Sequence, residues 1–224
     1  MTNPRSSPAD GTAIAVIGAT GYVGQHIAAE ALKRGHTVLG LSRTPSTETP
    51  DGVSIRTGSI EDTAAVERLA TEASTLIVAV PASLSGNPNL PSIVPQLLEV
   101  ISRCGCRLGV VGGAGSLLVA PDGPRLVDAP DFPQAAKPEA LAQIDALDQL
   151  RISTSSGDWF YLSPAAKFGS HSPGIRTGRY RVGGDVLLRD ENGRSAISGD
   201  DYAIALIDEV EQPAHHRQRF SVAY

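Results

Sequence analysis

The chain has 224 residues, of which 19 are Lys or Arg and 24 are Asp or Glu, so its formal net charge is −5. This acidic balance argues against nucleic acid as the main partner, because binding to phosphates requires a basic surface. Hydrophobic residues make up 41% of the chain, too many for general disorder, and no run of about 18 apolar residues is present that could span a membrane.

Residues 1–11 lack an apolar stretch, so we expect a flexible N-terminus of a cytoplasmic protein and no secretory signal. From residue 12 onward, short apolar runs alternate with amphipathic stretches. The runs are continuous, as in strands that are covered on both faces. The strands predicted in this part of the chain are residues 12–17, 37–41, 53–57, 75–80 and 107–111, and the predicted helices are residues 22–34, 61–71, 93–103 and 138–150.

This alternation at crossover spacing predicts an α/β fold with a doubly wound parallel sheet and helices on both faces. The last part of the chain differs, since the segments 180–189 and 195–197 flank Asn192-Gly193, a dipeptide that favours a hairpin turn. Further predicted elements are strands at 159–162 and 219–224 and a helix at 200–210. No linker divides the chain, so we expect one domain over residues 12–224, with a small substrate-side region in its C-terminal part.

Three glycines, Gly18, Gly21 and Gly24, lie where the first predicted strand leads into the first predicted helix. Gly18 permits the tight turn, Gly21 lets a pyrophosphate approach the backbone, and Gly24 lets the helix pack close to the sheet. The free amides and the positive dipole at the helix start can then bind the anion. The residues predicted to bind a dinucleotide here are Gly18, Thr20, Gly21, Tyr22, Val23 and Gly24; the alternative is a purely structural glycine turn.

The second predicted strand ends in Leu41-Ser42-Arg43, without the carboxylate that usually holds the ribose hydroxyls of NAD. Arg43 can instead pair with a 2′-phosphate and stack on adenine, and Ser42 can donate a hydrogen bond to that phosphate. We therefore expect NADP(H) to be preferred over NAD(H). The alternative is that Arg43 is a solvated loop charge.

Ligands of open α/β sheets lie beyond the carboxyl ends of the strands. The loops after the next three predicted strands therefore belong to the same expected site, near adenine, the cofactor ribose and the nicotinamide in turn. The additional residues predicted to bind the cofactor are Ser59, Ile60, Val80, Pro81, Ala82, Gly112 and Gly113, with Pro164 after the following strand.

The glycine spacing G-x-x-G-x-x-G is the form found in extended and atypical short-chain dehydrogenases/reductases. Four later stretches, at residues 110–117 (VVGGAGSL), 158–166 (DWFYLSPAA), 174–180 (GIRTGRY) and 198–209 (SGDDYAIALIDE), resemble the NAD(P)H-binding, NmrA-like group of that superfamily. Within the group they are most similar to proteins named NADH-flavin reductases, relatives of biliverdin-IXβ/flavin reductase. The resemblance runs from about residue 12 to the end and implies a Rossmann-like domain, a nicotinamide cofactor and a flavin or other small aromatic acceptor.

Working members of the wider superfamily usually carry Tyr-x-x-x-Lys, in which the lysine helps the tyrosine to donate a proton. This chain lacks the pair, because Pro133 and Ser163 stand four positions before Lys137 and Lys167. Two functions therefore remain open. In the first, NADPH reduces a small-molecule acceptor directly, and Ser116 is the best candidate to hydrogen-bond that acceptor, unless it is only a turn serine. In the second, the protein is a non-catalytic redox sensor that acts through a protein partner.

No metal site is predicted. The pair His215-His216 lies in a polar turn and is expected at the surface, and Asp200-Asp201 are interpreted as acids that favour the start of a helix.

Tyr161 lies in a predicted strand and is expected in the core. The loop 113–133 and the segment 167–198 are rich in Gly, Pro and Ser, and we expect them to form the substrate side. The sequence predicts no particular oligomeric state.

Overall fold

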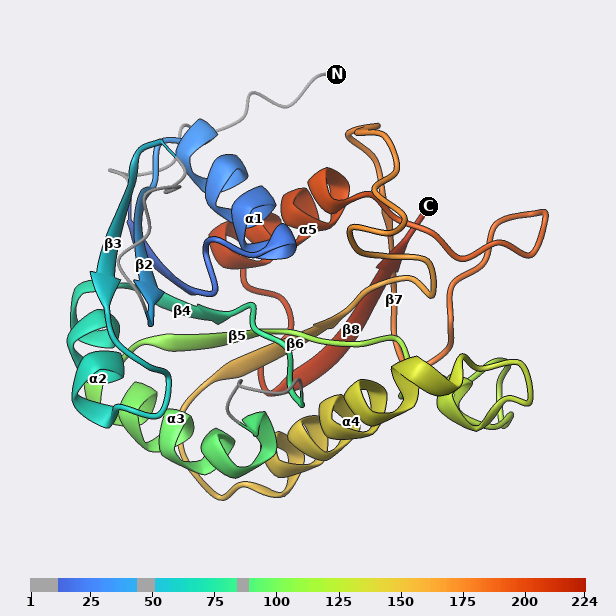
Figure 1. Cartoon of the computed structure of the whole chain (residues 1–224), viewed down its shortest axis with the longest axis horizontal. Coiled ribbons are helices and arrows are strands. Elements are labelled where there is room, and N and C mark those ends of the chain that lie inside the picture. Colours follow the sequence, from blue (N-terminus) through green and yellow to red (C-terminus); the bar gives the residue numbers. More distant parts are fainter. Residues whose placement is uncertain (1–11, 44–50, 84–88) are drawn as a thin grey trace.

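The computed structural model of the chain describes residues 12–43, 51–83 and 89–224 (Figure 1). The expected flexible N-terminus, residues 1–11, lies outside these ranges. The strands are β1 (Ala13–Ile17), β2 (Thr37–Ser42), β3 (Val53–Thr57), β4 (Thr75–Val78), β5 (Arg107–Val111), β6 (Trp159–Ser163), β7 (Arg181–Gly183) and β8 (Gln218–Ala223). The α-helices are α1 (Tyr22–Lys33), α2 (Thr63–Glu72), α3 (Leu90–Cys104), α4 (Lys137–Ile152) and α5 (Gly199–Glu211), and η1 (Leu126–Asp128) and η2 (Gln134–Ala136) are short 3₁₀ helices.

The described strands form one sheet in the order β3-β2-β1-β4-β5-β6-β8-β7. Neighbouring strands are parallel except for β7, which runs antiparallel to β8. The order reverses at β1, since β2 and β3 lie on one side of it and β4 and β5 on the other. In sheets of this kind the crevice at such a reversal binds ligands. The predicted doubly wound parallel sheet is thus confirmed.

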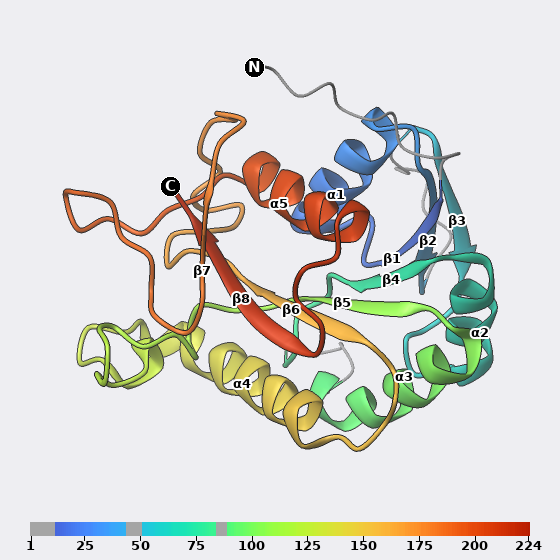
Figure 2. The same ribbon diagram turned by 180° about the vertical axis from the view of Figure 1, so that it is seen from behind.

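Helices cover both faces of the sheet. Figures 1 and 2 show α1 and α5 on one face and α2, α3 and α4 on the other. Ile14 and Val16 of β1 pack in the core on the α1 side, whereas Ala15 and Ile17 pack in the core on the α2 side. Neither face of such a strand contacts solvent, so neither needs polar side chains. This explains the continuous apolar runs of the sequence. Within the described ranges, no helix is long and apolar enough to cross a membrane.

The predicted hairpin around residues 192–193 is wrong. A tight turn does form there, because the Asp190 N–H donates to the Arg194 carbonyl over 2.7 Å. The flanking segments do not pair with each other, however. The edge of β8 takes β7 as its neighbour, and Ala196 forms a parallel bridge with Lys167. Pairing with the distant strand β8 therefore replaced the local pairing that the turn signal suggested.

Candidate functional site

The turn between β1 and α1 is built around two glycines that the packing requires. Gly18 has a φ of +91°, a conformation that other residues rarely adopt, and a Cβ there would lie 2.6 Å from the Ala79 carbonyl oxygen. A Cβ at Gly24 would lie 2.0 Å from the carbonyl oxygen of Gly18. The turn is therefore packed tightly against both the chain after β4 and the first turn of α1.

Gly21 is different, because neither its conformation nor its packing requires a glycine. Its φ is −78°, which any residue adopts. Within residues 12–43, 51–83 and 89–224, a Cβ there would approach only the Gly18 carbonyl oxygen, at an ordinary contact distance of 3.4 Å. A glycine at this position leaves the backbone open to close approach from outside the protein.

The amides at the start of α1 lie beside this opening. Gly21 caps the helix without a side-chain hydrogen bond, and the first helical hydrogen bond runs from Gln25 N–H to the Gly21 carbonyl over 2.9 Å. The N–H groups of residues 22–24 come before that bond, so they have no acceptor in the helix itself. Together with the helix dipole they form a site that suits a phosphate group.

The side chain of Tyr22 extends from this turn to the substrate-side segment. Its hydroxyl donates to the Pro173 carbonyl over 3.4 Å, and its ring meets His26 edge-on with 4.7 Å between centroids. Phe168 lies at 6.5 Å in a similar arrangement. Burial raises the pKa of the Tyr22 phenol. The side chain of Tyr22 is thus engaged with the substrate-side segment, and its backbone amide is one of the donors at the start of α1.

The ends of β2 and β3 are joined by a hydrogen bond from Gly58 N–H to the Ser42 carbonyl, 2.9 Å long. Arg43, which follows Ser42, is exposed. After β3, the Ser59 hydroxyl accepts a hydrogen bond from the next turn, whereas Ile60 is 4% exposed and belongs to the core on the α2 side. Arg43 and Ser59 thus lie near the same edge of the sheet as the glycine turn, and the side chain of Ile60 is turned into the core.

The loop after β4 is tied to α4 by a residue that the sequence did not single out. The carboxylate of Glu139 accepts hydrogen bonds from Ala82 N–H over 2.7 Å, from Ser83 N–H over 2.8 Å and from the Ser83 hydroxyl over 3.0 Å. Among the predicted residues of this loop, Ala82 is buried, and Val80 and Pro81 are partly exposed.

The loop after β5 rests on Tyr161. A Cβ at Gly112 would lie 2.1 Å from the Tyr161 ring, and Gly113 N–H donates to the Tyr161 hydroxyl oxygen over 3.0 Å. That hydroxyl in turn donates to Gln143 of α4. Burial raises the pKa of Tyr161. The expectation that Tyr161 is a core residue is confirmed, and its phenol supports the backbone of the glycine-rich loop.

At the end of β6, the hydroxyl of Ser163 is fully buried and has no hydrogen-bond partner among the described residues. It directly precedes Pro164, which was predicted to border the nicotinamide. A buried hydroxyl without a partner is unfavourable in a protein interior. This one lies at the carboxyl edge of the sheet, where a ligand is expected.

Ser116 lies further along the loop after β5, where its hydroxyl oxygen accepts a hydrogen bond from Arg219 Nη1 over 3.2 Å. Arg219 is in β8, and its guanidinium also pairs with Asp185. No pattern in the sequence indicates a role for Arg219, because nothing near it in the chain signals a contact with the loop after β5.

The two segments expected on the substrate side do lie against each other. Leu118 N–H donates to the Asp185 carbonyl, and Leu187 N–H donates to the Leu118 carbonyl, each over 2.8 Å. Figure 1 shows the segment 167–198, in orange, on the side of the molecule toward which β5, β6 and β8 run.

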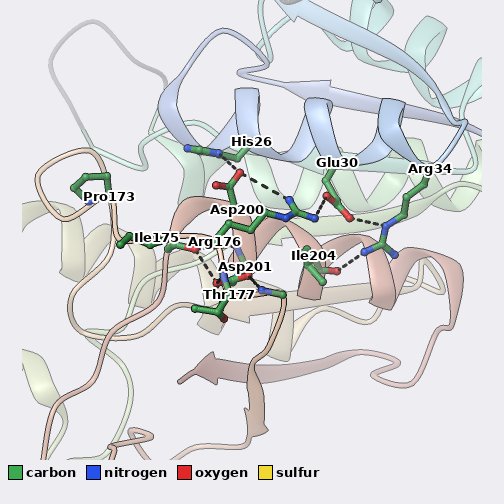
Figure 3. Close-up of polar contacts among 12 residues, drawn as sticks. His26, Glu30, Arg34, Pro173, Ile175, Arg176, Thr177, Asp200, Asp201 and Ile204 are labelled. Atoms are coloured by element: carbon green, nitrogen blue, oxygen red, sulfur yellow. Dashed lines mark hydrogen bonds and ion pairs between the residues drawn. The ribbon is translucent and has the colours of Figure 1, made fainter.

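Asp201 holds the substrate-side segment to the start of α5 (Figure 3). Its buried carboxylate accepts hydrogen bonds from Gly178 N–H over 2.7 Å, from Thr177 N–H over 2.8 Å and from the Tyr224 hydroxyl over 2.6 Å. Burial alone would raise the pKa of Asp201, but these hydrogen bonds outweigh it, so the pKa lies below its usual value. The sequence interpretation of an acid at a helix start is correct, and the structure adds the anchoring role.

A second contact ties the same segment to α1. Arg176 donates to the buried Glu30 carboxylate over 2.8 Å (Figure 3). Beside it, His26 Nδ1 of α1 lies 3.1 Å from Asp200 of α5 and joins the two helices to each other. The segment is thus attached to both helices of this face, and its contacts with α1 lie at both ends of that helix, at Tyr22 and at Glu30.

The two histidines near the C-terminus make contacts within the protein. His215 stacks on Phe220 with 3.9 Å between the ring centroids, and its Nδ1 lies 2.7 Å from a carboxylate oxygen of Glu209. His216 is exposed and lies beside Asp158. In residues 12–43, 51–83 and 89–224, no group of three or more His, Cys, Asp or Glu side chains is arranged to hold a metal ion.

Comparisons with known proteins agree with this geometry. A family model described as NAD(P)H-binding matches residues 18–213. The uncharacterised protein YwnB of Bacillus subtilis is 38% identical over 212 residues, which are 93% of this chain and 97% of YwnB.

Two solved structures are also similar over nearly the whole chain. A protein from Burkholderia pseudomallei that is provisionally named an exported protein is 38% identical, with a TM-score of 0.83 over 95% of this chain and 100% of that one. A protein from Streptococcus pneumoniae that is provisionally named an NADH-flavin reductase is 34% identical, with a TM-score of 0.80 over 95% of this chain and 99% of that one.

Proposed function

Since the chain belongs to the NAD(P)H-binding family, we propose that it is an NADPH-dependent reductase that transfers hydride to a flavin or another small conjugated acceptor. In this reaction NADPH supplies the hydride, and one proton from solvent or a polar group completes the reduction of the acceptor. The provisional name of the Streptococcus pneumoniae protein supports this choice of acceptor.

The observation that carries the proposal is the opening at Gly21. The glycines on either side are required by packing, whereas a Cβ at Gly21 would meet no atom of the described residues closer than 3.4 Å. A Cβ there would instead occupy the space in which a pyrophosphate contacts the backbone. The amides of residues 22–24 then bind the pyrophosphate as hydrogen-bond donors at the helix N-terminus.

The ends of the other strands support one direction for the bound cofactor. In the sheet, β2 and β3 lie on one side of β1, so Arg43 and Ser59 hold the adenine end. The loops after β4 and β5 lie on the other side and hold the ribose and nicotinamide end, with Pro164 beyond them. In this arrangement Arg43 and Ser42 bind the 2′-phosphate of NADPH.

The substrate-side segment has a charge that suits an anionic acceptor. Residues 167–198 contain six Lys and Arg residues against three Asp and Glu residues, a net charge of +3 in a chain of net charge −5. In the described ranges, no Asp or Glu carboxylate lies within 4 Å of the charged group of four of these six, namely Lys167, Arg179, Arg189 and Arg194, whereas Arg181 donates to the main-chain oxygen of Tyr224. Such a region attracts anions and so favours acceptors that carry a phosphate or a carboxylate.

One observation favours a second function. Burial and hydrogen bonding commit the phenol of Tyr161 to the core, and neither Lys137 nor Lys167 has a tyrosine four positions earlier. A protein without a Tyr-Lys pair can bind NADP(H) and report redox state to a protein partner instead of reducing an acceptor.

Calorimetric titration with NADPH and NADH tests the cofactor assignment. We expect NADPH to bind roughly tenfold to a hundredfold more tightly, because a hydrogen bond to a charged group contributes about 1.5–3 kcal/mol. Arg43→Leu should remove this difference, whereas Arg68→Leu, on the exposed side of α2, should preserve it. No heat with either nucleotide would refute the proposal.

A second assay separates the reductase from the sensor. NADPH oxidation is followed by the loss of its absorbance, with free flavins and quinones as acceptors. Turnover with one of them supports the reductase. Tight NADPH binding without turnover on any of them supports the sensor.

A further inference from the structure

We propose that Glu139 is a positioning residue for the nicotinamide end of the cofactor site, an inference that rests on the proposed function. Its carboxylate holds the loop after β4 directly, and it holds the loop after β5 through Gln143 and Tyr161. These are the two loops that border the ribose and the nicotinamide in the proposed arrangement.

The contact with the loop after β4 is unusually complete for one side chain. Each oxygen of the Glu139 carboxylate accepts two hydrogen bonds, Oε1 from Ala82 N–H and the Gln143 side-chain amide, and Oε2 from the N–H and the hydroxyl of Ser83. Two consecutive backbone amides are thus directed at one carboxylate. All four contacts bring a donor to a carboxylate oxygen, so Glu139 holds the loop as an acceptor.

The position of Glu139 in the fold favours this role. It lies in the first turn of α4, where a negative charge is stabilised by the helix dipole, and Pro138 precedes it at the helix start. The helix sets the direction of the side chain toward the carboxyl end of β4 before any ligand arrives.

A chain of hydrogen bonds continues from Glu139 to the loop after β5. Gln143, one helical turn later, donates to Glu139 over 3.2 Å, and its side-chain oxygen accepts from the Tyr161 hydroxyl over 3.1 Å. Gly113 N–H completes the path at 3.0 Å from the Tyr161 oxygen. Gln143 is only 7% exposed and Tyr161 is fully buried, so water does not readily replace these contacts.

The same loop after β4 also touches the dinucleotide turn. The position of a Cβ on Gly18 is 2.6 Å from the Ala79 oxygen and 2.9 Å from a methyl carbon of Val80, so the loop lies directly against the glycine turn. A displacement of residues 79–83 would therefore change the shape of the ribose and nicotinamide end of the proposed site. It would leave the adenine end unchanged, because that end lies at β2 and β3, on the other side of β1.

The experiment compares two ligands on three proteins. Calorimetry measures the binding of NADPH, and of adenosine 2′,5′-bisphosphate, which lacks the nicotinamide half, to the wild type, Glu139→Gln and Asp148→Asn. The control Asp148 is on the same helix and forms only an exposed ion pair with Arg151 at 3.8 Å. In Glu139→Gln an NH₂ group replaces one carboxylate oxygen. This group is a donor, so it cannot accept the hydrogen bonds from the loop after β4.

We expect Glu139→Gln to weaken NADPH binding roughly tenfold, as expected for losing hydrogen bonds to a charged group, and to change binding of the bisphosphate by less than about twofold. Asp148→Asn should change neither. Equal weakening of both ligands, or of neither, overturns the positioning role. If the wild type binds the bisphosphate but not NADPH, or binds neither, the proposed function itself fails.

A second variant covers the case in which Glu139→Gln does not fold. Gln143→Met removes the side-chain link between Glu139 and Tyr161 at similar volume. It leaves the contacts of Glu139 with Ala82 and Ser83 in place, and the Tyr161 hydroxyl keeps the main-chain carbonyl of residue 143 as an acceptor at 3.2 Å. We expect the same selective loss of NADPH affinity, of about threefold, since a neutral hydrogen bond contributes less than one to a charged group. Unchanged NADPH affinity in Gln143→Met would show that the loop after β5 does not depend on Glu139.

Discussion

Arg219 donates a hydrogen bond to the hydroxyl oxygen of Ser116 over 3.2 Å, across 103 residues of sequence. A guanidinium has only donors, so the oxygen of Ser116 accepts, and its own proton is left to point elsewhere. The Arg219 side chain is only 2% exposed and is held by Asp185, so the serine is fixed in place. Ser116 is thereby suited to donate a hydrogen bond to an acceptor molecule.

Ser116→Ala should lower kcat/KM for the acceptor about threefold to tenfold, the loss expected for one neutral hydrogen bond. The Kd for NADPH should stay the same, because Ser116 is not part of the proposed cofactor site. Steady-state NADPH oxidation and calorimetry measure the two quantities. Ser102→Ala is the matched control, since Ser102 bonds to Ser156. The role of Ser116 would be disproved if both variants had wild-type kcat/KM.

The glycines of the first turn should respond differently to a methyl group. Gly24→Ala places a Cβ 2.0 Å from a backbone oxygen and should reduce the free energy of unfolding by about 2–3 kcal/mol. Gly21→Ala has room within the protein and should change stability by less than about 1 kcal/mol, yet weaken NADPH binding at least tenfold. Thermal unfolding and calorimetry on both variants check this. Wild-type affinity in Gly21→Ala would contradict the proposed pyrophosphate contact.

The anchor at Asp201 predicts a pH dependence of stability. Because the pKa of Asp201 is lower in the folded protein than its usual value of 3.8, its contribution is present in full above that pH. The contribution is lost as the pH falls through the lower, folded-state pKa.

Asp201→Asn should therefore lower the free energy of unfolding at neutral pH by about 1–3 kcal/mol and reduce its decline below about pH 4. Urea unfolding between pH 7 and pH 2 measures both effects. Asp131→Asn, at an exposed position, serves as the control. If the two variants lose stability with pH in parallel with the wild type, Asp201 does not act as an anchor.

The charge of the segment 167–198 predicts a preference among acceptors. Flavin mononucleotide differs from riboflavin by one phosphate, and we expect it to have a several-fold higher kcat/KM at low ionic strength. The difference should shrink as salt is raised toward about 0.5 M, because screening weakens the attraction. Arg179→Gln should reduce the difference and Arg103→Gln, on α3, should not. An equal kcat/KM for both flavins at low salt would contradict the prediction.

The sequence by itself determined most of the strands and helices and the glycine turn, because each of these depends mainly on neighbours in the chain. Continuous apolar runs mark strands that are buried on both faces, and a 3.6-residue period marks the helices between them. The turn at Gly18 is also local, since its conformation and the start of α1 are set within seven residues of sequence, 18–24.

Only the tertiary structure decided which distant side chains support the site. Glu139 meets Ser83 from 56 residues away, and Arg219 meets Ser116 from the last strand. In the same way β7 paired with β8 and not across the turn at residues 192–193. Such contacts depend on the spatial order of the strands in the sheet and on which face of each helix packs against it. No periodicity along the chain encodes them.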